Sequence, residues 1–307
     1  MKQFWPEGWL IDTPGNQAAL SSPLCLADAQ ARGIVLEARA AVCDASHNLI
    51  VDLGCMRGVI PRAEGAVGIA DGTVRDIALI SRVGKPVCFL VTGIGTGADG
   101  EPVATLSRRA AQELCLRAMV ARLRPGDVLD TRVTHLEPFG AFCDIGCGLA
   151  SLLPIDAISV SRISHPRDRF CAGDDIRAVV AGVEGVRVTL THKELLGTWG
   201  QNAARFTPGE TVSGIVRSVE EYGIFVELTP NLAGLAEPHR DVCAGQQASV
   251  YVKSILPEKM KVKLILIDSF ERQGPPEPLA YFLSGDYIPY WRYSPENCAR
   301  VIESRFD

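Results

Sequence analysis

The amino-acid sequence predicts a mainly β protein, built as a row of small five-stranded barrels joined by short helices. Three observations lead to this prediction: a motif that recurs at a fixed distance, a pair of β-prone segments that ends each repeat, and a repeat length that suits a small Greek-key barrel. The chain has 307 residues, enough for two or three domains. Hydrophobic residues make up 47% and charged residues 22%, which is typical of a folded protein and not of a disordered chain.

The recurring motif is an aromatic pair around a glycine, preceded 13 positions earlier by the glycine of a Pro-Gly turn. Phe139-Gly140-Ala141-Phe142 follows Gly126 at this distance, and Tyr222-Gly223-Ile224-Phe225 follows Gly209. The two copies lie 83 residues apart. Because glycine inside a strand often marks a β-bulge, we expect Gly140 and Gly223 to bend their strands and to bring both rings of a pair to one face.

Each copy ends in two β-prone segments that we expect to form a hairpin. These are 176–180 with 187–190 in one copy, and 248–252 with 261–265 in the other. The result is about five short strands in roughly 65–75 residues, the size of a small barrel. A weaker copy lies upstream, where 47–54 aligns with 139–146. There His47 and Ile50 replace the two aromatic residues.

The segments between and beside the copies carry helix signals. Ser107 is a predicted N-cap, and Ser22-Pro23 and Ser294-Pro295 combine a cap with proline at the first helical position. We therefore divide the chain into an N-terminal appendage with one short helix (1–32), a degenerate barrel (33–107), a basic linker helix (108–124), a barrel (125–192), a helical linker (193–205), a barrel (206–268), and an aromatic-rich tail (269–307) with a short helix over about 295–305. The glycine-rich segment 93–97 is predicted to be a loop between strands.

Charge and motif content exclude several functions. The net charge of −5 counts against nucleic-acid binding, because proteins of this class usually carry a basic surplus, but it is compatible with a local basic groove and with stacking on aromatic rings. The ten cysteines form no CxxC pair and the histidines are scattered, so we expect no metal site and no cofactor. Without a catalytic motif or a metal-binding carboxylate cluster, we expect no enzyme. No stretch approaches ~18 apolar residues and no signal peptide opens the chain, which favours a cytoplasmic protein without membrane contact.

The repeats resemble the S1 RNA-binding domain. The resemblance rests on a Gly-x-x-x-x-Gly-x-Val start, a Tyr/Phe-Gly-x-Phe-Val motif, a Gly-Leu pair and a closing hairpin with a basic residue. In the last repeat these residues are Gly209, Gly214, Val216, Tyr222, Gly223, Phe225, Val226, Gly234 and Leu235. The preceding repeat matches from Phe139 onward and has Thr131 in place of the second glycine. With its linker 193–199, the stretch 32–268 is similar to the tandem S1 domains of bacterial ribosomal protein S1 homologues.

This resemblance implies oligonucleotide-binding (OB) barrels that hold single-stranded RNA on one face without chemistry. Burial statistics alone favour a core position for aromatic residues, whereas the resemblance favours exposed rings that stack bases, worth about 1–3 kcal/mol each. It also places a basic residue beside the RNA backbone at the start of the last strand. The predicted RNA-binding residues are Phe139, Phe142, Arg187, Tyr222, Phe225 and Lys261, with Arg132 and Arg217 as second-rank candidates.

Two departures from the S1 pattern leave an alternative function open. Many S1 domains carry a histidine where this chain has Pro154 and Glu237, and a carboxylate there would repel phosphate. The first repeat lacks the aromatic pair, so we expect it to be structural or to face another protein. The main hypothesis is single-stranded RNA binding in translation or RNA metabolism, with the ribosome or RNA-processing proteins as further partners. The alternative is a protein-interaction scaffold whose barrels have lost RNA binding.

Overall fold

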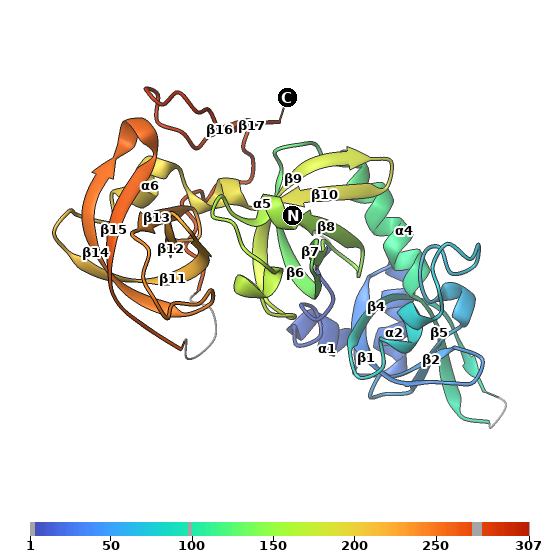
Figure 1. Ribbon diagram of the computed structural model, residues 1–307. Coiled ribbons are helices and arrows are strands. Elements are labelled where there is room, and N and C mark those ends of the chain that lie inside the picture. The colour runs from blue at the N-terminus through green and yellow to red at the C-terminus, as the bar shows by residue number, and fades with distance from the viewer. Residues whose placement is uncertain (1–3, 98–99, 272–277, 307) are drawn as a thin grey trace. The chain divides into compact units, whose positions relative to one another are not determined.

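Three closed five-stranded barrels make up most of the chain within residues 4–97, 100–271 and 278–306, which the computed structural model describes (Figure 1). These barrels confirm the predicted mainly β fold of tandem OB-like units. The chain divides into two compact units. The first contains residues 1–122 and 144–150, and the second contains residues 123–143 and 151–307.

The three barrels share one topology. The first contains β1 (Leu36–Cys43), β2 (Leu49–Asp52), β3 (Arg57–Ile60), β4 (Pro86–Thr96) and β5 (Pro102–Ser107). The second contains β6 (Val128–Glu137), β7 (Gly140–Asp144), β8 (Ala150–Pro154), β9 (Asp175–Glu184) and β10 (Arg187–Thr191). The third contains β11 (Thr211–Glu220), β12 (Gly223–Thr229), β13 (Leu232–Ala236), β14 (Gln247–Leu256) and β15 (Lys261–Phe270). In each barrel the third strand pairs in parallel with the fifth, and this pairing closes the sheet.

Alternation along the strands fills each barrel with small and branched side chains. In the third barrel Ile224 and Val226 point inward from β12, and Val250 and Val252 do so from β14. In the first barrel the glycine-rich end of β4 is not the loop that the sequence predicted, because Gly93 and Gly95 pair with Thr105 and Val103 of β5. Ladder hydrogen bonds to a neighbouring strand thus outweigh the low strand propensity of glycine.

Short helices connect and flank the barrels. They are α1 (Pro14–Leu20), α2 (Pro23–Arg32), α3 (Ile77–Ile80), α4 (Arg108–Ala118), α5 (Ile155–Ile158) and α6 (Trp199–Ala203), with 3₁₀ turns at Arg62–Glu64, Val120–Arg122, Pro166–Asp168, Lys193–Leu196 and Pro257–Lys259. Ser107 caps α4 by accepting a hydrogen bond from the Ala110 amide. The N-terminal segment holds two helices and not one, because Thr13 caps α1 in the same way that Ser22 caps α2. Among the described residues, no helix has the length and apolarity needed to span a membrane.

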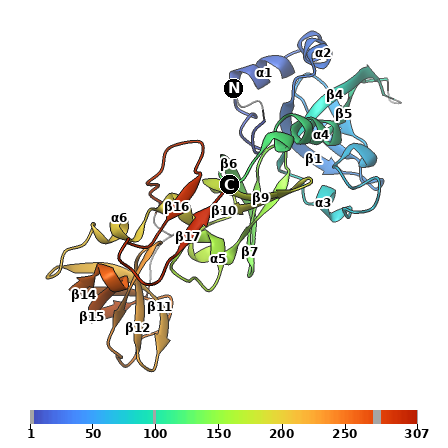
Figure 2. The same cartoon turned by 90° about the horizontal axis from the view of Figure 1, so that it is seen from above.

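The tail of the second unit is a two-stranded hairpin, and the predicted helix over 295–305 is wrong. Strand β16 (Tyr290–Arg292) pairs with β17 (Glu303–Arg305). The Ser294 hydroxyl does not cap a helix, since it accepts a hydrogen bond from the Ile302 amide. Trp291, Tyr293 and Phe306 are buried in a core that also contains residues of the second and third barrels, so the hairpin lies against both (Figure 2).

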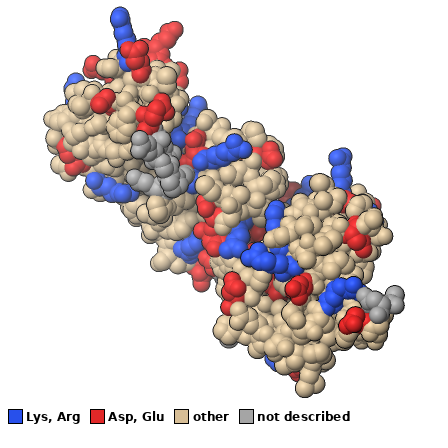
Figure 3. Space-filling model, turned by 90° about the horizontal axis from the view of Figure 1, so that it is seen from below, with Lys and Arg blue, Asp and Glu red and all other residues tan. Residues whose placement is uncertain are grey.

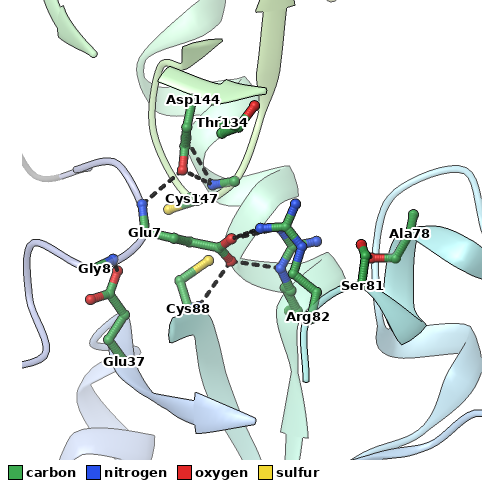
Figure 4. Close-up of polar contacts among 12 residues, drawn as sticks. Glu7, Gly8, Glu37, Ala78, Ser81, Arg82, Cys88, Thr134, Asp144 and Cys147 are labelled. Atoms are coloured by element: carbon green, nitrogen blue, oxygen red, sulfur yellow. Dashed lines mark hydrogen bonds and ion pairs between the residues drawn. The ribbon is translucent and has the colours of Figure 1, made fainter. Parts of the chain in front are cut away.

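A buried ion pair joins distant segments within the first unit (Figure 4). The Glu7 carboxylate accepts hydrogen bonds from Arg108 Nε at 2.6 Å, from Arg82 Nη1 at 3.0 Å and from the Cys88 amide at 3.1 Å. Burial raises the pKa of Glu7, but the two arginines outweigh burial and hold it below its ordinary value. The Glu7 amide donates to Asp144, whose pKa is raised to about 7 by burial and then by the charge of Glu7.

Candidate nucleic-acid interface

The aromatic pair of the third barrel lies at the end of the β11–β12 hairpin. Tyr222 belongs to the two-residue turn and Phe225 points outward from β12, between the inward-facing Ile224 and Val226. The two rings pack edge to face with centroids 6.1 Å apart. Tyr222 is 67% exposed and Phe225 is half-buried. Both rings therefore offer surface to solvent, as base stacking requires.

The glycine inside the aromatic pair of the third barrel does not form the predicted bulge. In the β11–β12 ladder the bulge lies on β11 between Val216 and Ser218, not at Gly223. A Cβ atom at Gly223 would lie 2.6 Å from the carbonyl oxygen of Ala236, and one at Gly140 would lie 2.5 Å from that of Leu153. Both glycines thus allow the third strand of the barrel to approach the aromatic hairpin closely.

A groove of about 580 Å³ runs beside Tyr222 and Phe225 over β13 and β15. Its charged lining residues are Glu237, Lys253, Lys261 and Lys263, which gives it a net charge of +2 on a chain with a net charge of −5. Lys253 Nζ lies 4.0 Å from Glu237 Oε1, and both side chains are largely exposed. Glu237 therefore balances one lysine, and the groove, which we call the barrel groove, stays basic.

The aromatic pair of the second barrel has the same geometry. Phe139 is 56% exposed, and its ring packs edge to face on Phe142 at 6.0 Å. A third ring joins them, because His135 stacks on Phe142 with centroids 4.3 Å apart and planes 7° apart. His135 is not among the RNA-binding residues predicted from the sequence. In a hairpin with a two-residue turn at 138–139, His135 pairs with Phe142 on the opposite strand. The position of the turn in the sequence could therefore have identified His135 as a neighbour of Phe142.

The basic candidates differ in their surroundings. Arg187 and Lys261 begin β10 and β15 and are exposed. Arg132 makes a two-point ion pair with Asp175, at 2.7 and 2.8 Å. The side chain of Arg217 is 9% exposed and lies beside Glu227 and Asp168. The structure brings Tyr222, Phe225 and Lys261 together in the barrel groove, whereas the charges of Arg132 and Arg217 are already balanced by carboxylates.

The first barrel presents a different surface at the same place. His47, which aligns with Phe139, has a left-handed backbone with φ of 61°. Its Nδ1 lies 3.4 Å from Asp76 Oδ2, and the other Asp76 oxygen accepts a hydrogen bond from Arg62 at 2.7 Å. A polar cluster of His47, Asp76 and Arg62 thus stands where the other barrels carry two aromatic rings.

Charge over the wider surface is mixed. On the face shown in Figure 3, Lys and Arg side chains are interspersed with Asp and Glu side chains. In the part of the chain that the structure describes, no cluster of three or more His, Cys, Asp or Glu side chains is arranged to hold a metal ion. The features that could bind a nucleic acid are therefore local: the aromatic pairs can stack bases, and the barrel groove can contact phosphates.

Comparison with known proteins gives matches to RNA-binding and ribosomal proteins. Residues 122–193, which include the second barrel, match the S1 RNA binding domain. The small ribosomal subunit protein bS1 of Leuconostoc lactis is 29% identical over 232 residues, which cover 70% of this chain and 52% of that protein. The bS1 homolog of Bacillus subtilis is 30% identical over 234 residues, which cover 70% of this chain and 58% of that protein. The chain thus spans little more than half the length of these relatives.

Among solved structures, the chain is similar to a multidomain protein with nucleic acid binding domains from Streptococcus pneumoniae. The similarity covers 79% of this chain and 76% of that protein, at 15% identity and a TM-score of 0.26. The sequence similarity to ribosomal protein S1 confirms the resemblance that the repeat motifs indicated.

Proposed function

We propose that this chain binds single-stranded RNA through its second and third barrels and catalyses no reaction. The observation that carries the proposal is the pair of exposed rings, Tyr222 and Phe225, beside the lysine-lined barrel groove. Stacking on the rings supplies affinity for bases of any sequence, and the lysines supply salt-dependent affinity for phosphates. Phe139, Phe142 and Arg187 form the corresponding site on the second barrel, with His135 as an additional ring.

The setting that we propose is translation or RNA metabolism in the cytoplasm, with the ribosome or RNA-processing proteins as partners. The similarity to ribosomal protein bS1 over 70% of the chain supports this setting. Arg132 and Arg217 are weaker candidates for phosphate contact, because each is engaged by a carboxylate. The first barrel contributes little stacking, since His47 and Ile50 occupy its aromatic positions.

The test is a titration of fluorescently labelled single-stranded RNA, read by anisotropy at moderate salt. We expect the double variant Tyr222→Ala, Phe225→Ala to bind at least about tenfold more weakly, because each stacked base is worth about 1–3 kcal/mol. The matched control is Phe270→Ala, which removes a ring that is 48% exposed on β15 and is not among the described residues that line the barrel groove. Unchanged affinity in the double variant would rule out the proposed site.

A protein-interaction scaffold is the rival function, favoured by the polar cluster of His47, Asp76 and Arg62 on the first barrel. Purification of the full chain from cells, before and after nuclease treatment, separates the two functions. RNA binding predicts that RNA is recovered with the chain and that nuclease releases its partners. Partners that persist after nuclease treatment, with no RNA recovered, would favour the scaffold.

A further inference from the structure

A second groove of about 580 Å³ continues the barrel groove within the same compact unit. It shares four lining residues with the barrel groove: Tyr222, Phe225, Ala233 and Met260. From there it runs past residues 160–164, which follow α5 of the second barrel, to Tyr293, Arg300 and Ile302 of the tail. We call it the seam groove. The two grooves meet at the aromatic pair and form one path.

The seam between the second and third barrels is held by hydrogen bonds to the turn at 229–232. Asn231 Oδ1 accepts from the Val160 amide at 2.9 Å, and the Pro230 carbonyl accepts from the Ser161 amide at 3.2 Å. The Tyr293 hydroxyl donates to the Asn231 carbonyl. Because these hydrogen bonds form within the protein itself, the seam groove is present without a ligand. Binding therefore carries no entropy cost for ordering the groove.

The charged groups of the seam groove favour an anion. Its lining includes Arg162, Arg217, Arg300 and Glu220. Arg217 is balanced by Glu227 and Asp168, which lie behind it. Arg162 and Arg300 are exposed, one from the second barrel and one from the tail. An extended polyanion that leaves the aromatic pair in this direction meets two guanidinium groups, which suit phosphate oxygens.

We propose that an RNA strand stacked on Tyr222 and Phe225 continues into the seam groove, where Arg162 and Arg300 contact its phosphates. The tail is then part of the RNA-binding surface as well as part of the core. This inference rests on the proposed function, since it extends the same strand beyond the third barrel. It predicts that affinity depends on RNA length, because a short strand fills the barrel groove alone and a longer strand reaches the arginines.

The experiment compares single-stranded RNAs of about 6 and about 12 nucleotides, within the range of site sizes of OB folds. In the full chain, we expect Arg162→Gln with Arg300→Gln to weaken binding of the longer RNA roughly tenfold at 0.1 M salt. The slope of log affinity against log salt should fall by about 1.4, or about 0.7 for each lost phosphate contact. Binding of the shorter RNA should stay within about twofold.

Two controls make the outcome specific. Arg205→Gln removes an exposed arginine of the same unit that is absent from the described lining of both grooves, and it should change neither affinity nor slope. Tyr222→Ala with Phe225→Ala should weaken both RNAs. If the double arginine variant binds the longer RNA like the wild type, or weakens both RNAs equally, the seam path is overturned while RNA binding stands. If the aromatic variant weakens neither RNA, the proposed function itself fails.

Discussion

Arg217 and Glu227 form a two-point ion pair across the β11–β12 hairpin, with Arg217 Nε 2.9 Å from Glu227 Oε2 and Nη2 3.0 Å from Oε1. Arg217 is the extra residue at the bulge between Val216 and Ser218, so its side chain is directed differently from that of a regular strand residue. Arg169 of the second barrel donates to the same carboxylate, and Arg217 also contacts Asp168. These four side chains connect the second and third barrels.

The first prediction concerns this four-residue cluster. Glu227→Gln leaves Arg169 and Arg217 with Asp168 as their counter-charge, and the free energy of unfolding should fall by about 3–5 kcal/mol. Asp175→Asn breaks the Arg132–Asp175 pair, whose side chains are 27% and 46% exposed, and should cost at most about 1 kcal/mol. Urea denaturation of both variants measures the difference. Equal losses would contradict a structural role for the cluster.

The second prediction concerns the close contact at Gly140. In Gly140→Ala the new Cβ meets the Leu153 carbonyl oxygen at 2.5 Å, so β8 must shift and stability should fall by about 1–3 kcal/mol. Gly182→Ala in β9 is the matched control, because nothing lies within 4 Å of its new Cβ. It should be neutral or stabilising by about 0.5 kcal/mol. Thermal unfolding tests the pair, and similar melting temperatures would refute the steric argument.

The third prediction is a loss of stability in mild acid that depends on His192. This ring is buried, its Nδ1 lies 3.0 Å from the Ile158 carbonyl and its Nε2 lies 3.2 Å from the Tyr281 hydroxyl. Burial lowers its pKa from 6.5 to about 4. As pH falls, the unfolded chain therefore binds a proton before the folded chain does, and up to roughly 3 kcal/mol of stability is lost between pH 6.5 and 4.

Unfolding of His192→Gln as a function of pH isolates this contribution. The variant should start from a lower stability at pH 7, and it should lose less of it on going to pH 4.5 than the wild type loses. His239→Gln, at an exposed position, should keep the pH dependence of the wild type. A pH profile that is the same in His192→Gln and in the wild type would show that His192 is not the responsible group.

The fourth prediction concerns Glu7. In Glu7→Gln the buried Arg108 loses its counter-charge, and the first unit should lose about 3–5 kcal/mol of stability. The pKa of Asp144 should fall from about 7, because the charge of Glu7 helps to raise it. Asp28→Asn, which breaks the exposed Asp28–Arg32 pair, should change neither quantity measurably. Urea denaturation and carboxyl NMR titration provide the two measurements.

The sequence predicts the barrels well because their signals recur. The 83-residue offset places the two aromatic pairs at equivalent points of equivalent hairpins, and alternation along β12 directs Ile224 and Val226 inward. Local secondary-structure propensity alone does not explain a motif that recurs at a fixed spacing. The recurrence therefore indicates a repeated tertiary fold. The exposed positions of Tyr222 and Phe139 agree with the expectation that the S1 resemblance gave.

Single local signals were less reliable. Ser294-Pro295 has the cap chemistry of a helix start, but burial of Trp291 and Tyr293 holds the tail in a hairpin. The bulge at Arg217 could not be located from sequence, because it shifts the strand register by one residue without any glycine at that point. Arg162 and Arg300 of the seam groove lie 138 residues apart in sequence, and only the fold brings them to one groove.

The core that joins the second barrel, the third barrel and the tail has a consequence for modularity. One hydrophobic cluster contains residues from all three of these segments. They include Val128 and Val179 of the second barrel, Val216 and Val250 of the third barrel, and Trp291 of the tail. Cutting the chain after residue 205 would uncover apolar surface on both fragments. The second barrel, the third barrel and the tail therefore share one core, and a fragment meant to keep that core whole must contain all three.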